Sequence, residues 1–188
     1  ASVIGFTLMD ATAKHLTESY HPVQIVWARF VGNLVIFVAI YHHHALLLLR
    51  TRQPGLQFSR ALMQLASVAL FFTSLQFIGL AEATAIMDIN PVLITLGAAL
   101  FLGEKIGPRR MAGIGAALIG AMIIIRPGLG VFQPAAMLPL IGAFTYAAGA
   151  LLTRMVRSDS VATSVMWSAV VGTVATSLVV PFFWTPID

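Results

Sequence analysis

Three charged side chains lie inside apolar segments of this chain: Asp10, Arg29 and Asp88. A charge at the middle of a membrane-spanning helix costs about 2.5–3.5 kcal/mol to insert, so it is expected to face a partner or a water-filled cavity. Such residues often bind polar substrates or carry protons across membranes. These residues therefore indicate recognition or proton transfer inside a membrane. A purely structural pair or hydrogen bond between helices is the alternative.

The segment that contains Asp88 is interrupted directly after it by Asn90 and Pro91. Proline has no backbone N–H and its ring collides with the preceding turn, so it leaves a carbonyl near Met87 without its helical donor. Broken helices of this kind often line the substrate sites of transporters, although a kink that serves only packing is the alternative. Tyr146 could stack on a ligand, or it could anchor the protein at the membrane interface as aromatic residues near helix ends often do.

Composition indicates the surroundings of these residues. The chain is 59% hydrophobic and 10% charged, whereas soluble globular proteins are about 25% charged. It contains no cysteine, which excludes thiol chemistry and cysteine-ligated metals in these residues. The net charge of +4 comes without a basic run interleaved with aromatic residues. We therefore expect a lipid bilayer, no nucleic-acid partner, no metal and no cofactor.

The sequence predicts an all-α integral membrane protein, a polytopic bundle of seven transmembrane helices. A helix needs about 20 apolar residues to cross a bilayer, and only helices and closed barrels satisfy every backbone group in lipid. Both ends of the chain lie in or beside apolar runs, so we expect a piece of a longer protein. The predicted spans are residues 1–16, 22–41, 61–80, 83–102, 111–125, 134–155 and 161–184, with residues 42–58 as the longest loop.

Lysine and arginine are distributed unevenly between the two sides of the predicted bundle. The loops after the second, fourth and sixth spans hold eight of these residues, and the opposite side holds two. Cytoplasmic loops carry the excess of such residues. The loops around Arg52, Arg109 and Arg157 are therefore predicted to face the cytoplasm.

With this orientation, the three charges within spans share one layer of the membrane. At 1.5 Å per residue they lie roughly 8–10 Å below the outer ends of their helices. An unpaired charge is expensive there. We therefore hypothesise that Arg29 pairs with Asp10 or Asp88. The other carboxylate would then meet a cationic group of a substrate or carry a proton.

Other polar or small residues have simpler interpretations. Glu82 complements the dipole of the fourth span at its first turn. Consecutive histidines point to different faces of a helix, so His42, His43 and His44 are interpreted as interfacial anchors. A loop ion network is expected from Glu104, Lys105, Arg109 and Arg110. Packing within the chain is expected from the small-residue stripe Ala112, Ala116 and Gly120, with an oligomer through this face as the alternative.

The pattern favours a transporter over other membrane proteins. An intramembrane enzyme would need a nucleophile–base pair or a metal cluster, and every histidine lies near a span end. A nucleotide-binding Gly-x4-Gly-Lys-Ser/Thr loop does not occur in the sequence. A non-transporting structural or receptor-like protein is the remaining alternative, and the three charges within spans argue against it.

A weak internal repeat is visible about 140 residues apart. Trp27, Gly32 and Asn33 recur at the same spacing as Trp167, Gly172 and Thr173. A unit of five helices has an odd number of crossings, so its second copy must be inverted in the membrane, as is common in secondary transporters.

Several motifs occur in order along the chain: Asp10-x3-Lys14, Gln24-x4-Arg29, Leu80-Ala81-Glu82-Ala83, Asn90-Pro91, Leu102-Gly103-Glu104, Gly107-x-Arg109-Arg110 and Arg126-Pro127-Gly128. In these motifs the chain resembles the EamA-like branch of the drug/metabolite transporter superfamily. The resemblance implies ten helices in two inverted five-helix repeats, the first covering residues 1–128 and the second, truncated after two helices, residues 129–188. It also implies alternating-access transport of a small polar metabolite, such as an amino acid or nucleoside, across the inner membrane. The Asp10/Lys14 pattern is similar to that of carriers that take up S-adenosylmethionine.

Overall fold

The structure is a computed structural model that describes residues 21–45, 47–125, 134–156 and 159–183. Every regular element in these ranges is a helix. Five stretches are long and apolar enough to cross a membrane: Pro22–Tyr41, Pro54–Ser74, Leu80–Leu102, Met137–Met155 and Val161–Phe183. The helices are α2 (Pro22–Tyr41), α3 (Pro54–Ser74), α4 (Leu80–Met87), α5 (Asn90–Leu102), α6 (Pro108–Ile125), α7 (Met137–Met155) and α8 (Val161–Val179). Short 3-10 turns cover His42–His44, Leu47–Leu49, Pro134–Ala136 and Val180–Phe183.

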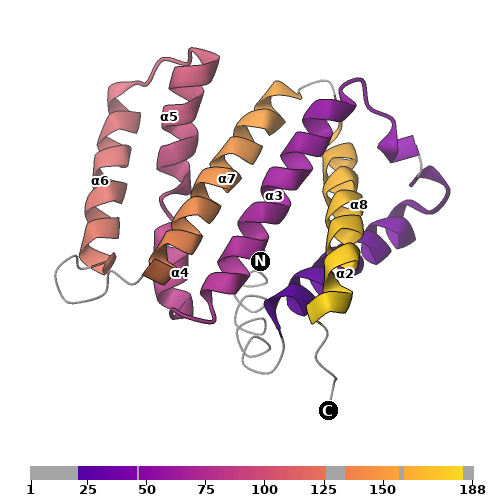
Figure 1. The fold of residues 1–188 in the computed structure, drawn as a ribbon. Coiled ribbons are helices and arrows are strands. Elements are labelled where there is room, and N and C mark those ends of the chain that lie inside the picture. The colour runs from indigo at the N-terminus through magenta and orange to yellow at the C-terminus, as the bar shows by residue number, and fades with distance from the viewer. Residues whose placement is uncertain (1–20, 46, 126–133, 157–158, 184–188) are drawn as a thin grey trace.

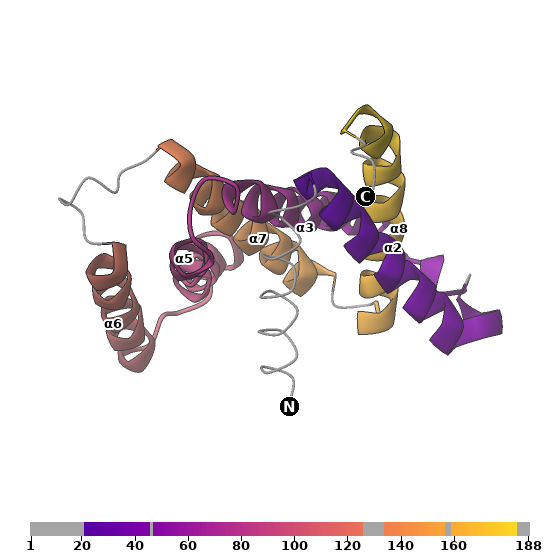
Figure 2. The same ribbon diagram turned by 90° about the horizontal axis from the view of Figure 1, so that it is seen from below.

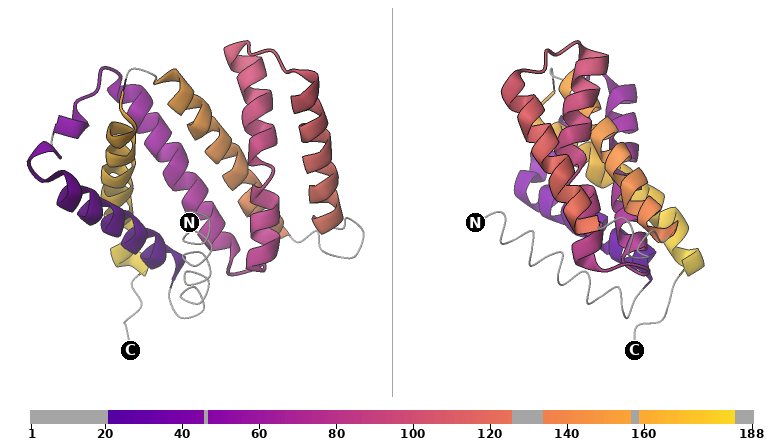
Figure 3. Two further views of the ribbon diagram at one scale, coloured as in Figure 1. Left: turned by 180° about the vertical axis from the view of Figure 1, so that it is seen from behind. Right: turned by 90° about the vertical axis from the view of Figure 1, so that its left-hand side faces the viewer.

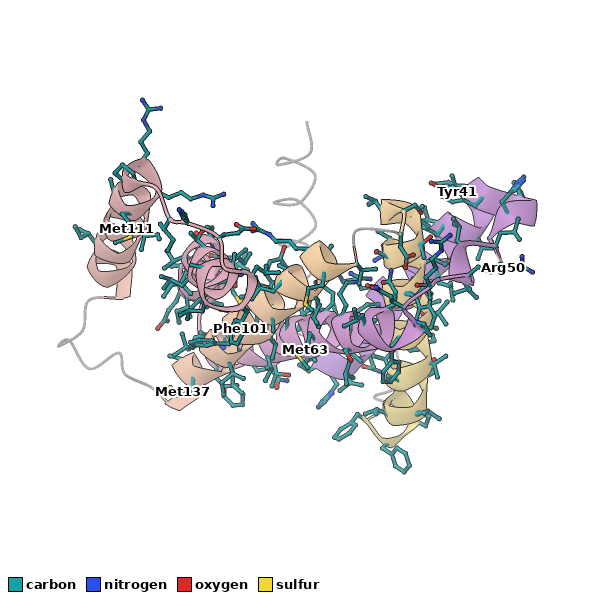
Figure 4. The ribbon with its side chains drawn as sticks, turned by 90° about the horizontal axis from the view of Figure 1, so that it is seen from above. Tyr41, Arg50, Met63, Phe101, Met111 and Met137 are labelled. Carbon is teal, nitrogen blue, oxygen red and sulfur yellow. The ribbon has the colours of Figure 1, made fainter. Side chains whose placement is uncertain are left out.

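The helices stand side by side in an open row, in the order α6, α5, α7, α3 and α8 (Figure 1). The helix α4 continues α5 at the lower end of the row, and α2 crosses α8 at the far edge (Figures 2 and 3). Seen from above, Met111 on α6 and Tyr41 at the end of α2 lie at opposite edges, with Met63 of α3 between them (Figure 4). The helix α3 contacts both of its neighbours in the row, α7 and α8.

Small residues on α7 bring it close to α3. Ala143 is fully buried and Ala147 is 4% exposed. A Cβ added at Gly142 would lie 3.4 Å from the carbonyl oxygen of Ser67, and one at Gly149 would lie 3.4 Å from Cβ of Met63. Such residues let two helix backbones approach closely in a membrane protein. The α3–α7 contact is thus a tight apolar packing that fixes the middle of the row.

The third span differs from its prediction at both ends. It was predicted for residues 61–80, and α3 runs from Pro54 to Ser74. Proline suits the first turn of a helix, where its missing N–H is not needed. The next two turns carry Gln57 and Arg60, which look unsuited to a membrane helix but are buried in the structure. The link to the fourth span accordingly falls at residues 75–79, and not near Glu82 as predicted.

The small-residue stripe on α6 does not pack as expected. Ala112 and Ala116 are exposed, and a Cβ added at Gly120 would meet nothing within 4 Å. The helix lies at the outer edge of the row beside α5 (Figure 1). The prediction that this stripe packs within the chain is therefore wrong for the described residues.

Among the described residues, only the Glu104–Arg110 pair of the predicted loop ion network forms, and the main partner of Glu104 comes from elsewhere. Both carboxylate oxygens of Glu104 accept hydrogen bonds of 3.0 Å from Nη1 of Arg154, at the end of α7. Arg110 contributes a second ion pair at 3.6 Å. The sequence pattern predicted Arg110 but gave no signal for Arg154, which lies 50 residues further along the chain.

Candidate functional site

A cavity of about 210 Å³ lies among α2, α3, α4 and α7. Polar and aromatic side chains share its wall, which suits a small molecule with both ring and polar parts. The cavity is lined by Arg29, Gln64, Ser67, Val68, Phe71, Phe72, Thr84, Met87, Asp88 and Tyr146.

The helix α3 supplies the longest wall of the cavity. Gln64, Ser67 and Phe71 follow one another at spacings of three and four residues, so they share one helix face. Ser67 is almost fully buried, and Gln64 is half-buried. The Gln64 amide offers one acceptor and two donors. Within the described residues it makes no hydrogen bond, so its polar atoms are available to a molecule in the cavity.

The opposite wall ends in the break between α4 and α5. The N–H of Asp88 donates to the carbonyl of Thr84 at 2.9 Å, and the N–H of Ile89 donates to the carbonyl of Ile86 at 3.3 Å. The second bond spans three residues in place of four, so the helix tightens and stops before α5 restarts at Asn90. The predicted break is confirmed, with Pro91 in the first turn of the new helix.

The break determines the surroundings of Asp88. The carboxylate was predicted inside a span, about one and a half turns from its start. In the structure Asp88 caps the C-terminal end of α4, is exposed and lines the cavity. Helix C-termini carry a partial negative charge. The two negative features together favour a cationic group at this end of the cavity.

Arg29 lies on the α2 side of the same cavity. Its guanidinium carbon is 5.8 Å from the centre of the Phe72 ring, a distance at which a cation is attracted to the ring face. Among the described residues, the ion pairs within 4.0 Å are both made by Glu104. Of the two partners predicted for Arg29, Asp88 is thus not paired with it in this structure, and Asp10 lies outside the described residues.

The aromatic and amide candidates separate into two groups. Tyr146 is 38% exposed and lines the cavity. Trp27 and Trp167 bond elsewhere, to Ser177 and to the Leu49 carbonyl. The amide oxygen of Asn90 is buried, and no described residue donates a hydrogen bond to it. Binding roles for Tyr146, Asn90 and Pro91 stay predictions.

Sequence reasoning missed six of the lining residues: Gln64, Ser67, Val68, Phe71, Phe72 and Thr84. The three-and-four spacing of Gln64, Ser67 and Phe71 was a usable signal, because it places a polar group and a ring on one face of an apolar helix. The sequence gave no signal for Thr84. Threonine commonly donates to a backbone carbonyl inside helices, and the Thr84 hydroxyl does so here, to the Leu80 carbonyl at 2.7 Å.

The comparisons with known proteins agree with this architecture. The riboflavin transporter of Rhizobium johnstonii is 33% identical over 153 residues, which are 80% of this chain and 51% of that protein. The S-adenosylmethionine uptake transporter of Rickettsia felis is 21% identical over 184 residues, 97% of this chain and 63% of that protein. The chain thus spans about half to two thirds of the length of these relatives.

A solved crystal structure shares the fold. It superposes with a TM-score of 0.73 at 19% identity and covers 99% of this chain and 68% of its own. Together with five apolar helices, the relatives show a multi-pass membrane protein, consistent with the inner membrane. Both relatives are named as transporters. The profile of the EamA-like transporter family matches residues 1–126, and the chain belongs to that family.

Proposed function

We propose that the full-length protein is a secondary transporter that moves a small polar metabolite across the inner membrane by alternating access. The observation that carries this proposal is the cavity beside the broken helix, where Asp88 and Arg29 face a shared space walled by α3. Broken helices near the middle of the bilayer hold substrates and coupling ions in many secondary transporters.

The lining supports a substrate with both a ring and a charged or polar part. Phe71, Phe72 and Tyr146 offer ring surfaces, Gln64 offers an amide, and Asp88 suits a cation. Riboflavin and S-adenosylmethionine, the compounds in the names of the two relatives, both join a ring system to a polar chain. An amino acid, a nucleoside or a related compound is therefore the class we propose, with proton coupling through Asp88.

We further propose the repeat architecture that the resemblance implies. Seven of ten spans would lie in this chain, with residues 1–128 as one repeat and residues 129–188 as the start of its inverted copy. The two tryptophans of the predicted repeat support this proposal. Trp27 of α2 donates to the Ser177 hydroxyl of α8 at 2.9 Å. Trp167 of α8 donates to the Leu49 carbonyl, just after α2, at 3.3 Å.

The orientation can be tested with two single cysteines, because the chain has none of its own. Lys105 and Gln76 are both exposed. Lys105 follows α5 at the upper end of the helices, and Gln76 lies in the link from α3 to α4 at the lower end (Figure 1). In intact cells, an impermeant maleimide added outside should label Gln76→Cys and spare Lys105→Cys. The reverse pattern would mean that the predicted orientation is inverted.

The function can be tested with the purified full-length protein in liposomes. We expect accumulation of riboflavin or S-adenosylmethionine, driven by an imposed pH gradient and without ATP. Empty liposomes and an unrelated reconstituted membrane protein are the controls. If folded protein moves neither compound, nor any of a panel of amino acids and nucleosides, under a pH, sodium or substrate gradient, the proposed substrate class is wrong.

A further inference from the structure

A cluster of buried polar side chains joins α3 to α8, away from the cavity. We call it the α3–α8 latch. Its side chains come from the segment before α3, from the first two turns of α3, and from the segment that starts α8. Its members are Thr51, Gln57, Arg60, Asp159, Ser164 and Ser168.

Hydrogen bonds connect the whole latch. Arg60 is 8% exposed, and its Nε donates to Oε1 of Gln57 at 3.1 Å. Its Nη2 donates to the Ser168 hydroxyl at 2.8 Å and to the backbone carbonyl of Ser164. Gln57 is fully buried, and its amide nitrogen donates to Asp159 at 2.9 Å and to the Ser164 hydroxyl at 3.2 Å. The Thr51 hydroxyl also donates to Asp159.

The chemistry of this contact differs from that on the other side of α3. Toward α7, the helix packs tightly on Gly142, Ala143 and Gly149. Toward α8 at this end, a buried guanidinium is held by neutral acceptors, and within the described residues it makes no ion pair within 4.0 Å. Water can take over each of these hydrogen bonds when the helices separate, so the net loss per bond is small. A polar contact of this kind suits a helix interface that opens and then closes again with the same residues paired.

A second polar contact lies at the same end of the row. Glu104, just after α5, is held by Arg154 in the last turn of α7. Figure 1 shows the start of α3, the start of α8, the end of α5 and the end of α7 all at the upper end. Both contacts join residues before 126, which the family profile matches, to residues after it.

Along α3, the cavity lies nearer the C-terminal end of the helix than the latch does. Its lining begins at Gln64 and continues to Phe72, four to twelve residues beyond Arg60. At 1.5 Å per residue, this is about 6–18 Å further along the helix. The latch and the Glu104–Arg154 pair thus hold together the helix ends between the cavity and one face of the membrane.

We propose that the α3–α8 latch, with the Glu104–Arg154 pair beside it, is the closed gate on the side predicted to face the cytoplasm. In the outward-accessible state both contacts are made, as here. When the cavity turns inward, Arg60 and Gln57 on α3 separate from Asp159, Ser164 and Ser168, and water takes over the broken hydrogen bonds. This inference rests on the proposed transport function, but its test needs no substrate.

The test measures which side of the membrane reaches a cysteine in the cavity. Gln64→Cys is the reporter, because Gln64 lines the cavity at the end nearest Arg60. In the full-length protein, Gln57→Ala should raise the rate of labelling by an impermeant maleimide in inside-out vesicles by roughly tenfold, since three latch hydrogen bonds are lost. Asp159→Asn should also raise the labelling rate in inside-out vesicles. It replaces Gln57→Ala in the test if that variant does not insert into the membrane.

The matched control is Thr153→Ala in the last turns of α7. Its hydroxyl is exposed and donates within its own helix, to the Gly149 carbonyl at 2.8 Å, so its loss should leave labelling from both sides unchanged. The gate is refuted if the latch variants label like Thr153→Ala, or if labelling rises equally in right-side-out and inside-out vesicles, which would mean general loosening. Transport is measured separately, in protein that keeps Gln64. A one-sided labelling shift would support the gate, and absence of transport of both test compounds by the protein that keeps Gln64 would count against the proposed substrates. Unchanged labelling, together with transport by the protein that keeps Gln64, would refute the gate and leave the proposed function standing.

Discussion

Transport by the full-length protein should fall roughly 10- to 150-fold in kcat/KM when Asp88 is replaced by asparagine, while membrane insertion stays intact. The carboxylate faces the cavity at the end of α4 and makes no ion pair with a described residue. A hydrogen bond to a charged group is worth about 1.5–3 kcal/mol, and this range corresponds to that loss of rate. The asparagine variant should also lose its response to an imposed pH gradient, because an amide cannot carry the proton.

The matched control for this change is Glu82→Gln. Both acids lie on α4, and both substitutions replace a carboxylate by an amide of nearly the same shape. Glu82 lies in the first turn of α4 and does not line the cavity, so its change should leave initial uptake rates within about twofold. Equal losses in the two variants would indicate an effect of charge on the helix and not on the site. Unchanged transport in Asp88→Asn would place substrate and proton elsewhere.

The spans were predictable where apolar runs have clear ends. The starts of three helices are marked by residues that commonly break or cap helices. Pro22 begins α2, Pro134 opens the 3-10 turn that leads into α7, and Ser160 caps α8. The start of α3 was missed because Arg60 was interpreted as a residue before the membrane. Its neutral partners come from α8, more than 100 residues away, so local sequence could not show that this arginine is buried.

The candidate site was predictable in part for a similar reason. A charge inside an apolar run stands out in any sequence, and Asp88 and Arg29 do line one cavity. Which other residues join them depends on which faces of α3 and α7 meet, and the small residues Gly142 and Gly149 decide that. Small residues occur throughout this chain, as on α6, where a Cβ added at Gly113, Gly115 or Gly120 would meet nothing within 4 Å among the described residues. Composition alone could not separate the two cases.

Replacing Gly172 by alanine should destabilise the protein strongly. A Cβ at this position of α8 would lie 2.5 Å from Cγ and Cε1 of Phe30 on α2. The Phe30 ring is 4% exposed and belongs to the buried cluster that also contains Val26 and Phe72, so it has little room to move. Forcing an extra carbon into such a contact costs about 1–3 kcal/mol. In a chain of this size that is roughly 2–12 °C of Tm, measured by tryptophan fluorescence in detergent.

Gly32 provides a control that also bears on the proposed repeat. It is the predicted counterpart of Gly172 in α2, but a Cβ added there would meet nothing within 4 Å of the described residues. Alanine also favours helix over glycine by about 1 kcal/mol, so Gly32→Ala should keep or slightly raise the Tm. The two repeat-related positions would then differ because the α2–α8 contact uses the glycine of one helix and the phenylalanine of the other. Equal drops in Tm would mean that Gly32 also faces a close neighbour in the full-length protein, as two-fold symmetry between the repeats would require.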